Sequence, residues 1–223
     1  MAARREYIGE YTMPIYAIAS TKGGPGKTTL AVCLADWWRR QGKTVTCLDT
    51  DPNRNLMSWI GKRSDEGLRC IAVGEDDVIA EARAAAKTSD IVIVDVAGFL
   101  ARGLLYAVGV ANAVLIPCRP AKGDVIEAGR TQQVIQSAAD LSGRVIPHAA
   151  VLTQVNRRAA VTEHSRKQLE GLGIPALIAD FPLRAIYQSA WYQGATPIEL
   201  GDNVAAGEIE AIAREAQQLA EVV

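Results

Sequence analysis

One ten-residue stretch, STKGGPGKTT at positions 20–29, constrains the fold of this chain more than any other part of the sequence. It follows the apolar run 14–20, which predicts a strand, and it leads into the run 27–41, which predicts a helix. Its three glycines allow the backbone to adopt positive φ and to approach a ligand closely. A strand, a flexible turn and a helix N-terminus in this order predict a phosphate-binding loop.

The end of this loop carries side chains suited to a nucleoside triphosphate. Lys27 is placed to neutralise the β- and γ-phosphates, and the Thr28 hydroxyl is placed to ligate Mg²⁺. A Gly-Lys-Thr triplet alone also occurs in ordinary turns, but the extra glycines and the flanking strand and helix favour the phosphate loop. The loop departs from the standard pattern at Thr21, where glycine is expected, and a second cation, Lys22, stands beside it.

Apolar runs alternate with helix-like segments along the rest of the chain. Further strands are predicted at 43–49, 68–73, 90–96, 113–118, 145–153 and 174–179. Further helices are predicted at about 53–61, 76–88, 101–110, 123–140, 161–171, 184–193 and 205–220. Several strand runs are almost continuously apolar, as in strands buried on both faces of a parallel sheet. The pattern predicts an α/β fold: a single doubly wound, mostly parallel sheet with helices on both faces, as in P-loop NTPases.

Length and composition indicate one soluble domain. The chain has 223 residues, of which 49% are hydrophobic and 22% charged, and no Pro/Ser-rich linker divides it. We predict an ATPase-type domain over 14–223, preceded by a short polar N-terminal extension over 1–13. The extension has two arginines but no apolar core behind them, and no run approaches the ~20 apolar residues of a membrane span. We therefore expect a cytoplasmic protein.

Carboxylates follow two of the predicted strands. Asp95 ends the run IVIVD, and Asp49 and Asp51 lie in CLDTDPN. Ligands bind beyond the carboxyl ends of parallel strands, so Asp95 and Asp49 are expected near the Mg²⁺ of the loop. Asp51 is the candidate that orients the attacking water. Two plainer interpretations stay open: Asp95 caps the next helix, and Asp-Pro-Asn forms a turn with a capping acid.

The cysteines and the net charge narrow the possible functions. Cysteines 33, 47, 70 and 118 are widely spaced and include no CxxC pair, so we expect buried thiols rather than a metal or iron–sulfur site. The net charge of −1 excludes a global basic signature for nucleic acid, although a local patch remains open.

The combination of KGGPGKTT, DTDPN and IVIVDVAG resembles the deviant Walker-A ATPases of the ParA/MinD type. Within this group the chain is most similar to the short, ParF-like ParA partition proteins, through its length, LIPCRPAKGD and the C-terminal GEIEAIAREAQ. The resemblance spans nearly the whole chain, from Ile15 to position 217. It implies ATP hydrolysis with Mg²⁺ at low intrinsic turnover.

The resemblance also implies a role for each site residue. Lys22 takes the place of the signature lysine, which reaches across a dimer interface to the partner's nucleotide and makes dimerisation ATP-dependent. The implied catalytic residues are Lys22, Lys27 and Asp51. The implied nucleotide-binding residues are Lys22, Gly23, Gly24, Gly26, Lys27, Thr28, Thr29 and Asn156. The implied metal-binding residues are Thr28, Asp49 and Asp95.

The partners follow from the same resemblance. It implies a homodimer on ATP binding, a ParB-like centromere-binding protein, and nonspecific DNA, with association with the nucleoid in the ATP state. The basic residues of the C-terminal third are Arg157, Arg158, Arg166, Lys167 and Arg184. They form either a DNA-binding patch or an ordinary solvated surface. The tail AAGEIEAIAREAQQLAEVV has four glutamates against one arginine, which opposes binding to an anionic membrane.

Two other functions are weighed against DNA partition. A ParA/MinD-type ATPase can position a different cellular cargo. An ATP-dependent small-molecule enzyme like dethiobiotin synthetase shares the fold and roughly this length, but its loop lacks the paired lysine. Lys22 together with DTDPN favours the ParA/MinD-type functions over such an enzyme.

Overall fold

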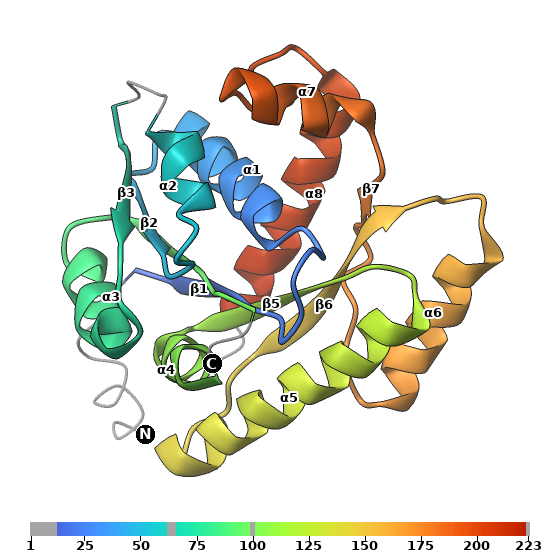
Figure 1. Cartoon of the computed structure of the whole chain (residues 1–223), viewed down its shortest axis with the longest axis horizontal. Helices are drawn as coiled ribbons and strands as arrows, with labels where there is room; N and C mark the ends of the chain where they lie inside the picture. The colour runs from blue at the N-terminus through green and yellow to red at the C-terminus, as the bar shows by residue number, and fades with distance from the viewer. Residues whose placement is uncertain (1–12, 62–65, 99–100, 222–223) are drawn as a thin grey trace, which may run out of the picture.

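The protein is built on one parallel sheet with the strand order β3-β2-β4-β1-β5-β6-β7 (Figure 1). The computed structural model describes residues 13–61, 66–98 and 101–221, so the predicted N-terminal extension lies outside the described residues except for Met13. The strands are β1 (Ile15–Ile18), β2 (Val45–Asp49), β3 (Leu68–Ala72), β4 (Ile91–Asp95), β5 (Ala113–Cys118), β6 (His148–Val155) and β7 (Phe181–Pro182). The predicted fold class is confirmed.

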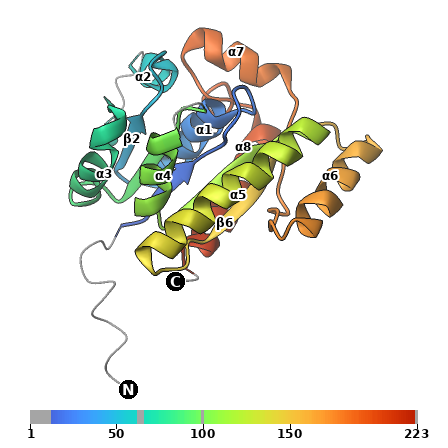
Figure 2. The ribbon, with the colours of Figure 1, turned by 60° about the horizontal axis from the view of Figure 1, so that its bottom comes forward.

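Helices cover both faces of the sheet. They are α1 (Lys27–Arg40), α2 (Asn55–Ile60), a short 3₁₀ helix η1 (Glu75–Asp77), α3 (Val78–Ala86), α4 (Ala101–Val110), α5 (Lys122–Ser142), α6 (Ala160–Gly171), α7 (Ala185–Gln193) and α8 (Asn203–Ala220). One apolar core lies between the sheet and α3, α4, α5 and α6, and a second lies between the sheet and α1, α2, α7 and α8 (Figures 1 and 2).

The apolar strand runs explain this two-sided burial. In β1, Ile15 and Ala17 belong to the first core, whereas Tyr16 and Ile18 belong to the second. Successive side chains of a strand point to opposite faces, so a strand covered on both faces must be apolar at every position. The central strands β1, β4 and β5 are buried throughout, as their sequences predict.

The strand predicted over 174–179 is wrong. The run forms no strand: it meets β6 in one isolated bridge, Ala150 to Ala176, which is closed by backbone hydrogen bonds of Ala150 with Pro175 and Leu177, and the last strand is Phe181–Pro182. The backbone N–H groups of Ile178 and Ala179 donate to the Glu215 carboxylate of α8, at 2.7 and 2.8 Å, instead of to β6. The run therefore leaves the sheet edge, because a charged side chain satisfies its backbone there.

The strand order places the phosphate loop near the middle of the sheet. β1 lies between β4 and β5, so the loop that follows β1 emerges at the carboxyl edge, beside the ends of both neighbours. Open parallel sheets bind ligands at this edge, where the strand order reverses. Among the described helices, none combines the length and the apolar character needed to cross a membrane.

Candidate nucleotide site

The phosphate loop runs from Ser20 into α1, and its geometry leaves donors for an anion. Gly24 and Gly26 have φ of 86° and 96°, values that side-chain-bearing residues rarely adopt. No side chain caps the N-terminus of α1, so its first N–H groups are not taken by a cap. The end of β6 supports the loop, because Thr153 Oγ1 donates to the Pro25 carbonyl at 2.7 Å. The loop is therefore held open as an anion site.

Lys27 is buried at the start of α1, where its ammonium group donates to the Lys22 carbonyl at 2.9 Å. Burial lowers the pKa of Lys27, although the carboxylates of Asp95 and Asp51 oppose this effect. The loop packs closely here, since a Cβ on Gly98 would lie 2.8 Å from the Lys22 carbonyl oxygen. Position 98, three residues after the end of β4, thus has to be glycine to let the two loops meet.

Asp95 ends β4 next to this lysine and is almost fully buried. Its Oδ2 accepts a hydrogen bond from Thr28 Oγ1 at 2.7 Å, whereas Oδ1 has no partner within the part of the chain that the structure describes. Burial, helped by the nearby Asp49, raises the pKa of Asp95 to about 7. A buried carboxylate oxygen without a donor is suited to a cation or to a cation-bound water.

Asp49 and Asp51 organise the turn after β2. Asp49 accepts hydrogen bonds from the backbone N–H of Asp51 at 3.0 Å and of Met57 at 2.9 Å, so both of its oxygens are engaged. Asp51 lies half-buried, and its Oδ1 accepts from the Asn53 backbone at 2.8 Å. Burial raises the pKa of Asp49 against these hydrogen bonds. Asp49 thus fixes the loop that carries Asp51.

Thr28 and Asp95 form a donor set that fits Mg²⁺. This ion is usually bound by one or two carboxylates together with phosphate oxygens and waters, so it needs no cage of protein ligands. Accordingly, no group of three His, Cys, Asp or Glu side chains suited to a metal occurs among the described residues. With both oxygens on backbone donors, Asp49 is suited to act on the ion through water.

Thr21 and Lys22 attach the first half of the loop to α5. Thr21 Oγ1 donates to Glu127 Oε2 at 2.7 Å, and its N–H donates to Thr131 Oγ1 at 3.2 Å. Lys22 Nζ lies 2.6 Å from Asp124 Oδ1. These three contacts come from one face of α5, since its residues repeat at i, i+3 and i+7. Thr21 replaces the expected glycine because its hydroxyl anchors the loop.

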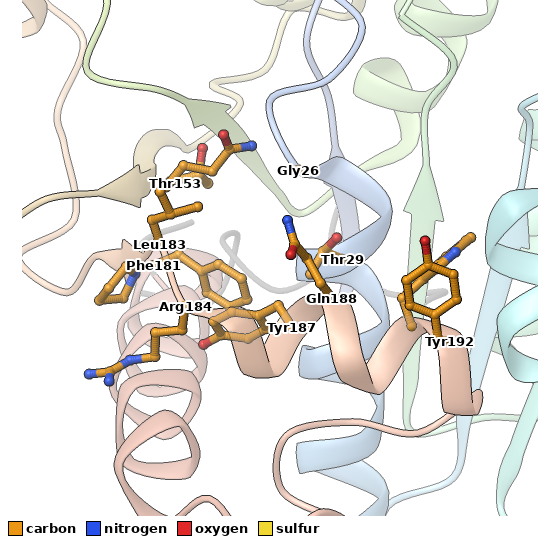
Figure 3. A pocket seen from close by; sticks show the side chains of 12 residues that line it. Gly26, Thr29, Thr153, Phe181, Leu183, Arg184, Tyr187, Gln188 and Tyr192 are labelled. Atoms are coloured by element: carbon orange, nitrogen blue, oxygen red, sulfur yellow. The ribbon is translucent and has the colours of Figure 1, made fainter.

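A cavity of about 470 Å³ opens beside the loop (Figure 3). Its lining residues are Gly26, Thr29, Thr153, Gln154, Phe181, Pro182, Leu183, Arg184, Tyr187, Gln188, Trp191 and Tyr192. Its wall on α7 joins aromatic rings and an amide, a mixture suited to the flat face and polar edge of a nucleobase. Sequence reasoning missed this wall. The signal is the spacing of four residues between Tyr187 and Trp191, and again between Gln188 and Tyr192.

The structure places the predicted nucleotide contact Asn156 elsewhere. It is exposed, lies outside the cavity wall, and accepts a hydrogen bond from the Arg158 N–H at 3.1 Å in the turn before α6. Gln154 takes the place beside the loop, because a φ of 52° turns its side chain to donate to the Gly24 carbonyl at 3.3 Å. The nucleotide contact of Asn156 therefore stays a prediction.

Four of the five residues of the predicted basic patch form ion pairs, whereas the fifth, Arg158, is exposed. Arg157 pairs with Asp180 at 2.7 Å and with Glu208 at 3.1 Å, and Arg184 pairs with Glu208 at 2.6 Å. The remaining pairs are Arg166–Asp180 at 3.9 Å and Lys167–Glu163 at 3.7 Å. The arginine pairs connect α6 and the turn before it to α8 and to the segment before α7, whereas the lysine pair lies within α6. The DNA-binding role of these residues stays a prediction.

Comparisons with known proteins agree on one family. Residues 16–181 match the family described as CobQ/CobB/MinD/ParA nucleotide binding domain. The chain is 35% identical to "Protein ParA" of Rhizobium radiobacter over 146 residues, 65% of this chain and 66% of that protein. It is 29% identical to "Maintenance of carboxysome distribution protein A" of Halothiobacillus neapolitanus over 205 residues, 89% of this chain and 94% of that protein.

A solved structure shows the same fold. The septum site-determining protein MinD of Pyrococcus horikoshii, in complex with Mg-ADP, superposes with a TM-score of 0.76. The match covers 93% of this chain and 97% of that one, at 16% sequence identity. At this identity the likeness shows the fold alone.

Proposed function

The chain belongs to the CobQ/CobB/MinD/ParA nucleotide-binding family, and on this premise we propose that it is a Mg²⁺-dependent ATPase that partitions DNA. One observation carries the proposal. The phosphate loop, which carries Lys22 and Lys27, lies beside the buried carboxylate of Asp95, whose Oδ1 has no partner among the described residues. A cavity suited to a nucleobase opens next to the same loop. The MinD relative that contains Mg-ADP supports the choice of nucleotide and ion.

In this function the residues of the site bind the phosphates, the metal ion and the attacking water. Lys27 exchanges the Lys22 carbonyl for the phosphates, which offer its ammonium group a stronger, charged partner. Thr28 and Asp95 would hold Mg²⁺, and Asp49 would act on the ion through water. When bound, the ion neutralises charge that develops on the phosphates. Asp51 orients the water that attacks the γ-phosphate, from a turn that Asp49 fixes.

The second lysine couples nucleotide binding to assembly. We assign Lys22 to the nucleotide of a partner subunit, as an arginine finger supplied in trans. The loop already delivers one ammonium group from its own chain, so a second subunit supplies the additional positive charge. ATP-bound subunits would then dimerise, and the ADP-bound form would separate.

DNA partition is the cargo function that the relatives support. Besides the ParA protein of Rhizobium radiobacter, the chromosome-partitioning ATPase Soj of Thermus thermophilus is 44% identical over 59 residues. The proposal includes nonspecific DNA binding in the ATP state, association with the nucleoid and a ParB-like stimulating protein. It does not rest on the paired arginines of the C-terminal third.

Positioning of another cargo is the second candidate. The carboxysome-distribution relative aligns over 94% of its own length, against 66% for the ParA protein. A small-molecule enzyme like dethiobiotin synthetase remains the alternative of another class. DNA separates these functions, because neither a DNA-independent positioning system nor such an enzyme needs duplex DNA for turnover.

The decisive measurement is ATP turnover with and without nonspecific duplex DNA and the protein encoded beside this one. We expect slow basal turnover, stimulation by both together, and DNA binding that requires ATP and weakens steeply with salt. Lys22→Ala should retain ATP binding but lose stimulation and ATP-dependent dimerisation, whereas Lys27→Ala should lose ATP binding. Dimerisation of Lys22→Ala at the wild-type level would rule out the trans role, and turnover indifferent to DNA would rule out partition.

A further inference from the structure

Two cations meet on one buried carboxylate at the start of α5. Asp124 is 3% exposed, and its Oδ1 lies 2.6 Å from Lys22 Nζ. Arg119, the residue after β5, donates from Nε to Oδ2 at 2.5 Å and from Nη2 to Oδ1 at 3.2 Å. Among the described residues, Oδ1 is therefore shared between the lysine and the arginine, whereas Oδ2 accepts from the arginine.

The lysine of this cluster is held at both its ends. Its carbonyl accepts the Lys27 ammonium, and its own ammonium rests on Asp124. In the ligand-free chain, both lysines of the loop thus have partners in their own subunit. Phosphate must displace the Lys22 carbonyl from Lys27, and the nucleotide of a partner subunit must displace Asp124 from Lys22.

Arg119 lowers the free-energy cost of separating Lys22 from Asp124. A buried carboxylate that loses its sole cation is strongly destabilised, because no water replaces the lost charge. Here Arg119 contacts both oxygens, so Asp124 keeps a charged hydrogen-bond partner after Lys22 leaves. Arg119 lies on the loop before α5, and its side chain is 35% exposed. It can therefore keep its contact with Asp124 while part of its guanidinium group stays hydrated.

We propose that Asp124 and Arg119 are positioning residues for Lys22. Asp124 retains the Lys22 ammonium within its own subunit, and Arg119 stabilises the carboxylate that Lys22 leaves behind when it moves to a partner's nucleotide. This inference rests on the proposed trans role of Lys22. Lys22 contacts either Asp124 of its own subunit or the nucleotide of the partner. The relative free energies of these two contacts set the protein concentration at which ATP-bound subunits dimerise.

The test uses the full chain with saturating Mg²⁺ and a non-hydrolysable ATP analogue, and measures dimerisation against protein concentration by sedimentation. Asp124→Asn should lower the dimer dissociation constant roughly fivefold, because one charge-assisted hydrogen bond no longer competes for Lys22. Arg119→Ala should raise it roughly threefold, because Lys22 becomes the sole cation on Asp124. Arg119→Lys should restore most of the wild-type value.

Opposite shifts distinguish positioning from a merely structural role. If the cluster only stabilises the fold, both variants weaken dimerisation in proportion to their loss of thermal stability, and the inference fails. Should Asp124→Asn not fold, Arg119→Ala decides alone, since unchanged or tighter dimerisation in that variant overturns the inference. A wild-type chain that stays monomeric with the analogue refutes both the trans role and this inference. A wild type that dimerises through Lys22, with variants that do not shift oppositely, refutes this inference alone.

Discussion

Two carboxylates flank the phosphate loop from opposite sides, Asp95 at the end of β4 and Asp124 at the start of α5, and both are almost fully buried. Asp95 has one hydroxyl donor and an oxygen without a partner in the described chain, and burial raises its pKa to about 7. Burial alone would also raise the pKa of Asp124, but hydrogen bonds from Arg119 and Lys22 hold it below its usual value.

The difference shows on which side of the loop the buried carboxylate has its positive partners within the chain. The α5 side has its cations in the chain itself, so it is stable without a ligand. The β4 side carries a carboxylate that Thr28 and the nearby Lys27 compensate only in part, so it gains stability from a bound cation. Buried charge without a partner is costly, and such sites are retained where function needs them. The following predictions test this contrast, beginning with the largest expected effect.

Removing the Asp95 charge should stabilise the ligand-free protein. Its raised pKa means that the ionised form is disfavoured in the fold, and this cost is present above about pH 7 and disappears as pH falls toward the unfolded value of about 4. Asp95→Asn should therefore raise the free energy of unfolding by about 2 kcal/mol near pH 8, and by much less near pH 5. Urea unfolding in chelator measures it. A variant less stable than wild type at the higher pH would show that Asp95 is already compensated.

Removing the Asp124 charge should have the opposite sign. Its lowered pKa means that the ionised form contributes stability above the unfolded pKa, and that this contribution is lost as pH falls through the lower folded value. Asp124→Asn should lower the free energy of unfolding by about 1 to 2 kcal/mol, equally near pH 8 and pH 5. The same urea titrations measure it. If the loss differs between the two pH values, groups other than this ion pair determine it.

Removing the hydroxyl that ties the loop to α5 should cost least. Thr21→Val keeps the shape of the side chain but loses the hydrogen bond to Glu127. We expect the free energy of unfolding to fall by about 1 kcal/mol. Thr21→Ser is the matched control, since it keeps the hydroxyl and should stay close to wild type. A loss in Thr21→Ser with Thr21→Val at the wild-type value would assign the effect to the methyl group instead of the hydrogen bond.

Local patterns were sufficient for most of the fold. Each predicted helix is present with its ends shifted by a few residues, and the strand predictions hold up to β6. The phosphate loop and the two acidic loops also lie together at one edge of the sheet, because parallel strands bring their carboxyl ends together. Burial on both faces is visible in sequence as an unbroken apolar run, which explains this success.

The prediction over 174–179 failed for a reason the same pattern cannot show. An apolar run that starts beside the sheet can still leave it when a distant side chain satisfies its backbone, as Glu215 does here. The nucleotide contact of Asn156 stays a prediction, and the structure places this residue outside the cavity wall. The positive φ of Gln154 turns that side chain toward the loop and leaves Asn156 to cap a turn.

The sequence by itself determined the strand-loop-helix unit, the second lysine beside it and the family resemblance, because each depends on residues close together in the chain. Only the tertiary structure decided which cation meets which carboxylate. Lys22 and Asp124 lie 102 positions apart, and the arginines of the C-terminal third pair with acids on other elements. Such pairs depend on how whole helices pack on the sheet, and packing at that range leaves no periodic trace in the sequence.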